Sequence, residues 1–258
     1  MTLKLAILGN THAHALQAAQ DRTPGRWTGV DMTIVATHGA QLLQTRIEDG
    51  LLVPTSPEVA LALPEEDGLD LEAYDAFAIV GGQVAPSRQM VMLYRGARWP
   101  GLPSLFDVPD LAAMPETLIP GEAARAAIIE MVRTEPGPQF ARMLRAATEK
   151  PIFYLSQPRL NVLGCDGRNG HVRALMRADR SGDSAALADM FDDWVGDALD
   201  EDEVIWLPQP GPTLATPLTT RARFAASRKD IVHANAIYGR IVLDQLVQAA
   251  RSELRAAA

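Results

Sequence analysis

The chain has 258 residues, of which 47% are apolar and 22% are charged, as in an ordinary folded protein. It has room for one large hydrophobic core and no Gly/Ser linker or internal repeat, so we expect a single domain over residues 1–258. A formal net charge of −8 argues against a nucleic-acid partner, which needs clustered Lys and Arg.

Local composition excludes further classes. No apolar run approaches the roughly 20 residues of a membrane span, and the run at 3–8 is too short for a signal-peptide core. The single cysteine, Cys165, is expected to be structural, because it permits neither an intramolecular disulfide nor a multi-cysteine zinc site. We therefore expect a cytoplasmic protein that needs no cofactor. The oligomeric state stays open, a homo-oligomer included.

Short apolar runs alternate with helical patterns along the chain. Strands are predicted at 3–8, 32–36, 76–80, 151–155 and 204–207. Helices are predicted at 14–20, 121–133, 139–150 and 184–199, and after Asn235. This alternation is typical of a three-layer, flavodoxin-like α/β fold, in which a parallel sheet of about five strands carries helices on both faces. Within it, the acidic segment 192–203 is expected to be a solvated helix face.

The C-terminal segment places Asp230 and His233 three residues apart. At that spacing a carboxylate can accept the Nδ1 proton of an imidazole and leave Nε2 free to act as a general base. Loops that leave the carboxyl ends of parallel strands share one rim of the sheet. Four residues that follow predicted strands can converge on that rim: Thr11, His38, Gly82 and Gln157.

Residues 83–120 form a long connection between the third predicted strand and the next helix. They contain six prolines, together with Trp99 and Phe106, and show little periodicity. A segment of this length is either a folded excursion over the active-site rim that shapes a substrate pocket, or a passive surface loop.

Three short blocks, in their order and spacing, resemble the SGNH/GDSL hydrolase family. They are Gly9-Asn10-Thr11-His12, Val80-Gly81-Gly82 and Asp230-Ile231-Val232-His233. The resemblance implies a flavodoxin-like fold and the hydrolysis or transfer of ester-linked acyl groups. It also implies that Thr11 stands at the nucleophile position, with His233 as the general base and Asp230 as the residue that orients it.

The same resemblance implies an oxyanion hole. The backbone N–H groups of Thr11 and Gly82 would form it, and Gln157 or Asn161 could add an amide donor, although the family's Gly-x-Asn-Asp block has no clean counterpart. We then expect a small-molecule ester or an acylated carbohydrate as substrate. Its expected contacts are Asn10, His12 and His38.

Thr11 departs from the family pattern, in which the nucleophile is a serine. Its methyl group restricts χ1 and crowds the incoming carbonyl. A second hypothesis is therefore a catalytically silent relative that binds a carbohydrate or an acylated metabolite.

A third hypothesis is a metal-dependent hydrolase that uses His12, His14 and His233. The His-x-His pair resembles the metal-binding start of amidohydrolase barrels. We nevertheless expect no metal site, because residues two apart on a helix point away from each other. His14 is expected to be a packed residue of this helix.

Overall fold

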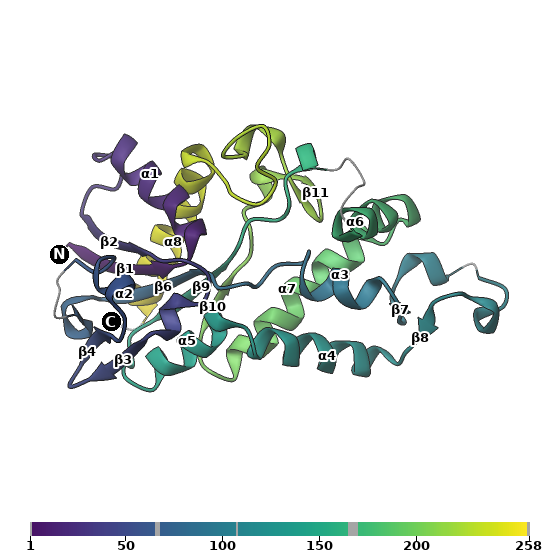
Figure 1. Ribbon diagram of the computed structural model, residues 1–258, viewed down its shortest axis with the longest axis horizontal. Coiled ribbons are helices and arrows are strands. Elements are labelled where there is room, and N and C mark those ends of the chain that lie inside the picture. Colours follow the sequence, from purple (N-terminus) through teal and green to yellow (C-terminus); the bar gives the residue numbers. More distant parts are fainter. Residues whose placement is uncertain (1, 65–67, 107, 165–169, 257–258) are drawn as a thin grey trace.

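A parallel sheet of five strands forms the centre of the molecule, in the order β10-β9-β6-β1-β2 (Figure 1). This computed structural model describes residues 2–64, 68–106, 108–164 and 170–256, so Cys165 lies outside the described residues. The strands are β1 (Leu3–Gly9), β2 (Val30–Ala36), β6 (Ala76–Gly81), β9 (Ile152–Ser156) and β10 (Ile205–Leu207). Counted along the chain their order is 2-1-3-4-5, the flavodoxin-like arrangement, and the predicted fold class is confirmed.

Helices cover both faces of the sheet. The longer ones are α1 (His14–Arg22), α4 (Gly121–Arg133), α5 (Pro136–Arg145), α6 (Gly170–Ser181), α7 (Ser184–Asp200) and α8 (Ala236–Ala256). Leu5 and Ile7 of β1 pack into a core with α1 and α8, whereas Ala6 and Leu8 face the core formed with α4 to α7. Because both faces are covered, the central strands are almost continuously apolar, which is why the sequence reveals them.

Three parts of the chain outside residues 83–120 are not predicted by the sequence. The first is an antiparallel sheet of β3 (Thr45–Glu48), β4 (Leu51–Pro54) and β5 (Leu69–Asp70), with the short helix α2 (Pro57–Ala60) between β4 and β5. The second is α6. The third is a hairpin of β11 (Leu214–Thr216) and β12 (Thr219–Thr220).

The 83–120 segment is folded. It contains α3 (Gln89–Tyr94) and the paired strands β7 (Ala97–Arg98) and β8 (Thr117–Leu118). Trp99 and Leu102 are fully buried in the core beneath α4 and α7, whereas Phe106 is 72% exposed. Much of this segment is therefore folded and buried, and its role over the active-site rim stays a prediction.

Helix α5 begins and ends earlier than predicted. The predicted range was 139–150, and the helix spans Pro136–Arg145. Pro136 is accepted because the first turn of a helix has no intrahelical partner for a backbone N–H, so proline costs nothing there.

None of the described helices is both long enough and apolar enough to cross a membrane.

Candidate active site

The chain turns sharply where β1 ends, at the point where the strand order reverses between β1 and β6. The Asn10 side chain accepts a hydrogen bond from the His12 backbone N–H at 3.1 Å, and the Asn10 N–H donates to Val80 O of β6 at 3.3 Å. These bonds fix a short 3-10 turn, Thr11–Ala13, which leads into α1. The carboxyl-end crevice at such a reversal is where α/β proteins of this type bind ligands. Thr11 stands there, half-buried.

A local turn positions the imidazole of His233. Oδ1 of Asp230 accepts the backbone N–H groups of Val232 at 3.0 Å and of His233 at 2.8 Å. This turn brings the other carboxylate oxygen, Oδ2, to 2.9 Å from His233 Nδ1. With Nδ1–H donated to Asp230, the Nε2 atom of His233 is left as an acceptor.

Thr11 and His233 meet across the sheet rim although they are 222 residues apart in the sequence. The Thr11 Oγ1 and His233 Nε2 atoms are 3.1 Å apart, so the threonine hydroxyl can donate to the free imidazole nitrogen. The structure thus brings Thr11, His233 and Asp230 into one chain of hydrogen bonds. Hydroxyl, imidazole and carboxylate in this order form the arrangement that activates a nucleophile.

The loop that carries His233 is held by backbone and amide bonds. The Asn161 N–H donates to Ile231 O at 2.8 Å, and the Ala226 N–H donates to His233 O at 3.0 Å. Downstream, the Asn235 amide donates to Arg223 O and Ala225 O while its Oδ1 accepts the N–H groups of Ile237 and Tyr238. Asn235 therefore joins this loop to the start of α8. These positioning roles were not expected from the sequence, in which the one available signal is an asparagine directly before a helical pattern.

Electrostatics keep Asp230 ionised. Partial burial raises the pKa of the Asp230 carboxyl, but hydrogen bonds from the His233 and Val232 N–H groups and from the His233 ring outweigh it. The pKa of Asp230 is therefore lower than its ordinary value. An ionised Asp230 can hold the Nδ1 proton and stabilise the imidazolium that forms when His233 takes a proton.

His12 is a buried, neutral histidine whose ring lies next to the ring of His233. The two rings have centroids 5.1 Å apart, and the His12 side chain is 5% exposed. Burial lowers the pKa of His12 to about 4, with the charge of His233 acting in the same direction and Gln157 and Asp230 opposing it. Its Nδ1 has no hydrogen-bond partner among the described residues. His12 therefore adds no positive charge next to the base at neutral pH.

The turn after β6 has an unusual backbone. Gly81, Gly82 and Gln83 have φ angles of +82°, +55° and +71°, in the left-handed region that favours glycine. A Cβ on Gly81 would lie 2.4 Å from Asn10 Oδ1, so it is Gly81 that packs against the nucleophile turn. Gly82 packs against Gly137 instead, where a Cβ would approach the Gly137 Cα to 2.3 Å. Only Gly82 was expected from the sequence to have a role here, whereas a missing Cβ is required at both positions.

The expected oxyanion donors can be compared by their hydrogen bonds. The backbone N–H groups of Thr11 and Gly82 donate to no described residue, which leaves them available to a ligand. Gln157 is buried at the end of β9, and its side chain interacts with His12. The Asn161 Nδ2 atom donates to Arg221 O, and its Oδ1 accepts the Leu163 N–H, so its role is structural. The oxyanion roles of Thr11, Gly82 and Gln157 stay predictions.

Two other predicted histidines lie apart from this cluster. His38 is exposed, and its backbone N–H donates to the Gln41 side chain at 2.8 Å. Among the described residues, His38 forms no hydrogen bond with Thr11 or His233. A contact between His38 and the substrate stays a prediction. His14 is exposed at the start of α1, so its predicted packing is wrong. In the described part of the chain no three His, Cys, Asp or Glu side chains are grouped to hold a metal ion.

A cavity of about 350 Å³ lies beside the triad, between α3 and the His233 loop. Its apolar lining comes from Met92, Leu160, Ile231 and Val232, and its polar lining from Ser87, Arg88, Gln157 and His171. Val232 is adjacent to His233 in the chain, and Gln157 touches His12, so two neighbours of the site contribute to the wall of this cavity.

The sequence matches no known protein family and no curated protein. Among solved structures, an extracellular lipase from Streptomyces rimosus is 13% identical with a TM-score of 0.47, over 95% of this chain and 99% of that chain. A protein assigned as an acylhydrolase from Bacteroides fragilis is 10% identical with a TM-score of 0.44, over 97% of this chain and 88% of that chain. An alpha/beta hydrolase enzyme from the metagenome of Lake Arreo, Spain, is 12% identical with a TM-score of 0.39, over 97% and 96%. The assignment of function therefore depends on the geometry of the site itself.

Proposed function

We propose that this protein is an acyl hydrolase or acyl transferase of the SGNH/GDSL type that acts on a small-molecule ester, an acylated carbohydrate included. The observation that carries the proposal is the 3.1 Å contact between Thr11 Oγ1 and His233 Nε2, with Asp230 Oδ2 2.9 Å from His233 Nδ1. The hydroxyl is in reach of its base, and the base is held in the tautomer that can accept the proton.

In the first half of the reaction Thr11 Oγ1 attacks the ester carbonyl carbon while its proton passes to His233 Nε2. The carbonyl oxygen becomes an oxyanion, and the free N–H groups of Thr11 and Gly82 are the candidate donors to it. When the tetrahedral intermediate collapses, the bond to the alcohol oxygen breaks and His233 gives that oxygen the proton. The acyl group is then esterified to Thr11.

In the second half a water molecule, or a second alcohol, attacks the acyl-threonine carbonyl. His233 takes a proton from the attacking oxygen and returns it to Thr11 Oγ1 as the carbonyl–Oγ1 bond breaks. Water gives the free acid and completes hydrolysis, whereas an alcohol gives a new ester. The cavity of about 350 Å³ beside Val232 and Gln157 is of the size that holds a small substrate group.

The test is the turnover of p-nitrophenyl acetate and butyrate by the wild-type protein, His233→Ala and His14→Ala. His233→Ala is expected to lose nearly all activity, because the base is absent. His14→Ala is the matched control, since His14 is exposed and forms no hydrogen bond with Thr11, His233 or Asp230.

Each other outcome points to one alternative. Loss of activity in His14→Ala or on chelation would instead support a metal-dependent hydrolase. No turnover by the wild-type protein, together with tight binding of an acylated sugar, would support the silent binding protein.

A further inference from the structure

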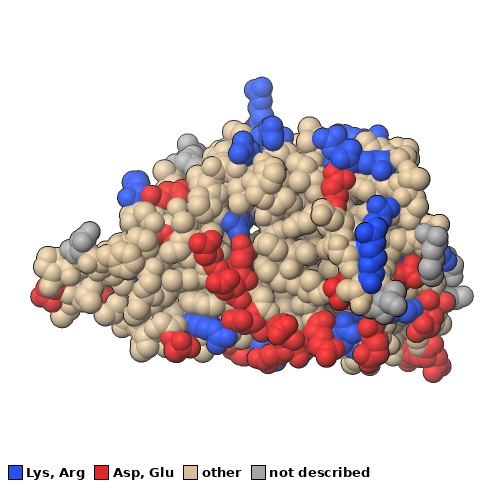
Figure 2. All heavy atoms as spheres, turned by 180° about the vertical axis from the view of Figure 1, so that it is seen from behind, with Lys and Arg blue, Asp and Glu red and all other residues tan. Residues whose placement is uncertain are grey.

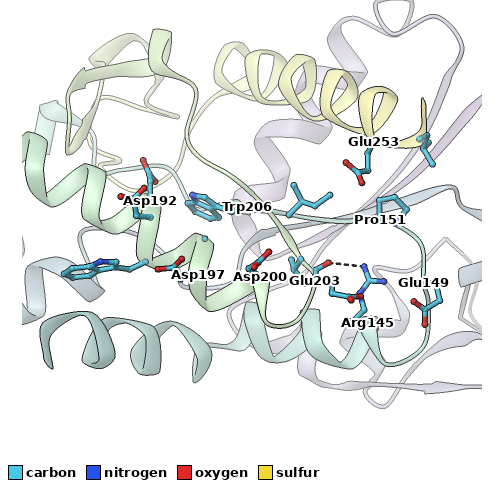
Figure 3. Close-up of a pocket in the computed structure, with 15 residues that line it drawn as sticks. Arg145, Glu149, Pro151, Asp192, Asp197, Asp200, Glu203, Trp206 and Glu253 are labelled. Atoms are coloured by element: carbon cyan, nitrogen blue, oxygen red, sulfur yellow. Dashed lines mark hydrogen bonds between the residues drawn. The ribbon is translucent and has the colours of Figure 1, made fainter. Parts of the chain in front are cut away.

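Charge is distributed unevenly between the two ends of the sheet. A hollow of about 1060 Å³ (Figure 3) lies at the amino ends of β9 and β10, whereas Thr11 and Gly82 follow the carboxyl ends of β1 and β6. Seven carboxylates line it: Glu149, Asp192, Asp193, Asp197, Asp200, Glu203 and Glu253. Arg145 is the one basic residue among the described residues of this lining, and it donates to the backbone oxygens of Thr148, Lys150 and Glu203. Two of the carboxylates pair with arginines outside the lining, Asp192 with Arg159 and Asp197 with Arg125. Figure 2 likewise shows Asp and Glu gathered along the lower part of one face.

The triad end has the opposite character. The cavity beside His233 has Arg88 and His171 in its lining, and none of the described residues that line it is Asp or Glu. A second hollow, of about 330 Å³, is lined by Arg95, Gly170, Arg173, Ala174, Arg177 and Arg180, again with no carboxylate among its described residues. Basic side chains thus line both hollows in a protein whose formal net charge is −8.

The two hollows are neighbours. His171 Nδ1 lies 3.1 Å from Ser87 O, so the start of α6 is held against the start of α3 where the cavity begins. Gly170, the next residue, lines the arginine hollow, and Arg95 and Arg173 guanidinium nitrogens lie 3.7 and 3.9 Å from the point where its Cβ would stand. Arg88 and Arg95 flank α3 two turns apart, so one helix carries basic groups toward both hollows.

Glu135 and Glu116 pair with two of the arginines on this surface. Arg88 has Glu135 at 3.5 Å, and Arg177 shares Glu116 with the buried Arg98. Arg95 and Arg180 are exposed and form no ion pair with a described residue. A guanidinium is a planar donor that recognises carboxylates and phosphates in particular. A surplus of such groups beside a catalytic cavity attracts an anionic substrate and raises its local concentration.

We infer that the natural substrate is an ester whose acyl chain carries a negatively charged group. Its carbonyl sits at Thr11, its chain passes through the cavity lined by Met92 and Val232, and its anionic end reaches the arginines of α3 and α6. This inference rests on the proposed function for the reacting end of the substrate. The acidic hollow at the other end of the sheet repels the same anion and so favours approach from the triad end.

The experiment compares p-nitrophenyl hexanoate with mono-p-nitrophenyl adipate, which share the leaving group and the chain length and differ in one terminal carboxylate. Shorter and longer half-esters of dicarboxylic acids, each with its neutral counterpart, find the chain length that reaches the arginines. We expect kcat/KM to favour the best anionic ester by about tenfold, and added salt to reduce this preference through screening.

The variants are Arg95→Gln with Arg180→Gln, and Arg46→Gln as the matched control. The ratio of anionic to neutral kcat/KM is expected to fall toward one in the double variant. It is expected to stay at the wild-type value in Arg46→Gln, because Arg46 is an exposed arginine of β3 that pairs with Glu48. Turnover of the neutral esters without preference for any anionic ester would overturn the inference and leave the proposed function intact.

Calorimetric titration with adipate and with hexanoate tests the same surface without catalysis. Tighter, salt-sensitive binding of adipate that Arg95→Gln with Arg180→Gln weakens, in a protein that turns over no ester, would uphold the anion site and refute the hydrolase. Equal binding of the two acids in such a protein would refute both.

Discussion

The methyl group of Thr11 separates this site from one built on serine. The hydroxyl keeps its 3.1 Å contact with His233, so the methyl does not prevent proton transfer to the base. It does add bulk next to the attacking hydroxyl, and it restricts χ1. We therefore expect Thr11→Ser to raise kcat on small p-nitrophenyl esters by about three- to tenfold, since misplacement of reacting atoms is costly. A slower Thr11→Ser enzyme would show that the site is adapted to threonine.

Asp230 is expected to act through the tautomer of His233. In Asp230→Asn the amide oxygen can still accept the backbone N–H groups of Val232 and His233, so the turn survives. The amide nitrogen would face Nδ1 and place the imidazole proton on Nε2, where it blocks proton transfer from Thr11. We expect kcat to fall by about three to four orders of magnitude. An unchanged circular dichroism spectrum and melting temperature would show that the loss is chemical, and retained activity would exclude this role.

His12 makes stability depend on pH. Burial lowers its pKa to about 4 from an ordinary value of 6.5, so the unfolded chain binds this proton first as the pH falls. The free energy of unfolding should therefore decrease between about pH 6.5 and about pH 4, by roughly 3 kcal/mol from this residue. Urea unfolding at about pH 7 and about pH 4.5 should show a smaller acid loss in His12→Gln than in the wild type. Equal losses would contradict a buried neutral His12.

Close backbone contact determines how α8 lies against α1. A Cβ on Gly239 would stand 1.9 Å from the carbonyl oxygen of Ala15, so Gly239→Ala must separate the two helices. We expect Gly239→Ala to lower the free energy of unfolding by about 2–4 kcal/mol. Gly196→Ala in α7 is the control, because its Cβ would meet no atom within 4 Å. That change should be neutral or stabilise by up to about 1 kcal/mol, as alanine favours a helix interior. Equal effects in thermal unfolding would contradict the helix packing.

The sequence predicts helices and strands well where one face of the element, or the whole element, is buried. All five central strands lie within two residues of their predicted ranges, because a strand covered on both faces is an apolar run. The β3–β5 sheet escapes prediction because Thr45–Glu48 is short and mostly polar, and β5 has two residues. The Asp230–His233 interaction could be predicted because both residues belong to one short turn. The contact of Gly81 with Asn10 and the bond from Asn161 to Ile231 could not, because each joins residues that are far apart in the sequence.

At the scale of the whole molecule, the strand order brings the site residues together, and the charge of the surface differs between the two ends of the sheet. The chain reverses its strand order between β1 and β6, so Thr11, Gly81 and the His233 loop meet at one rim although they come from distant parts of the sequence. The arginines of α3 and α6 lie at that end and the acidic hollow at the other. Overall composition gives the net charge of −8 but not this separation, which exists only after folding.

The central claim is that Thr11 is a nucleophile activated by His233, and covalent labelling tests it most directly. The protein is treated with a fluorophosphonate, digested, and mapped by mass spectrometry. We predict a single phosphonyl group on Thr11, formed slowly or not at all in His233→Ala, because the hydroxyl then has no base. Absence of label on Thr11 in a folded protein, or equal labelling of His233→Ala, would contradict the account.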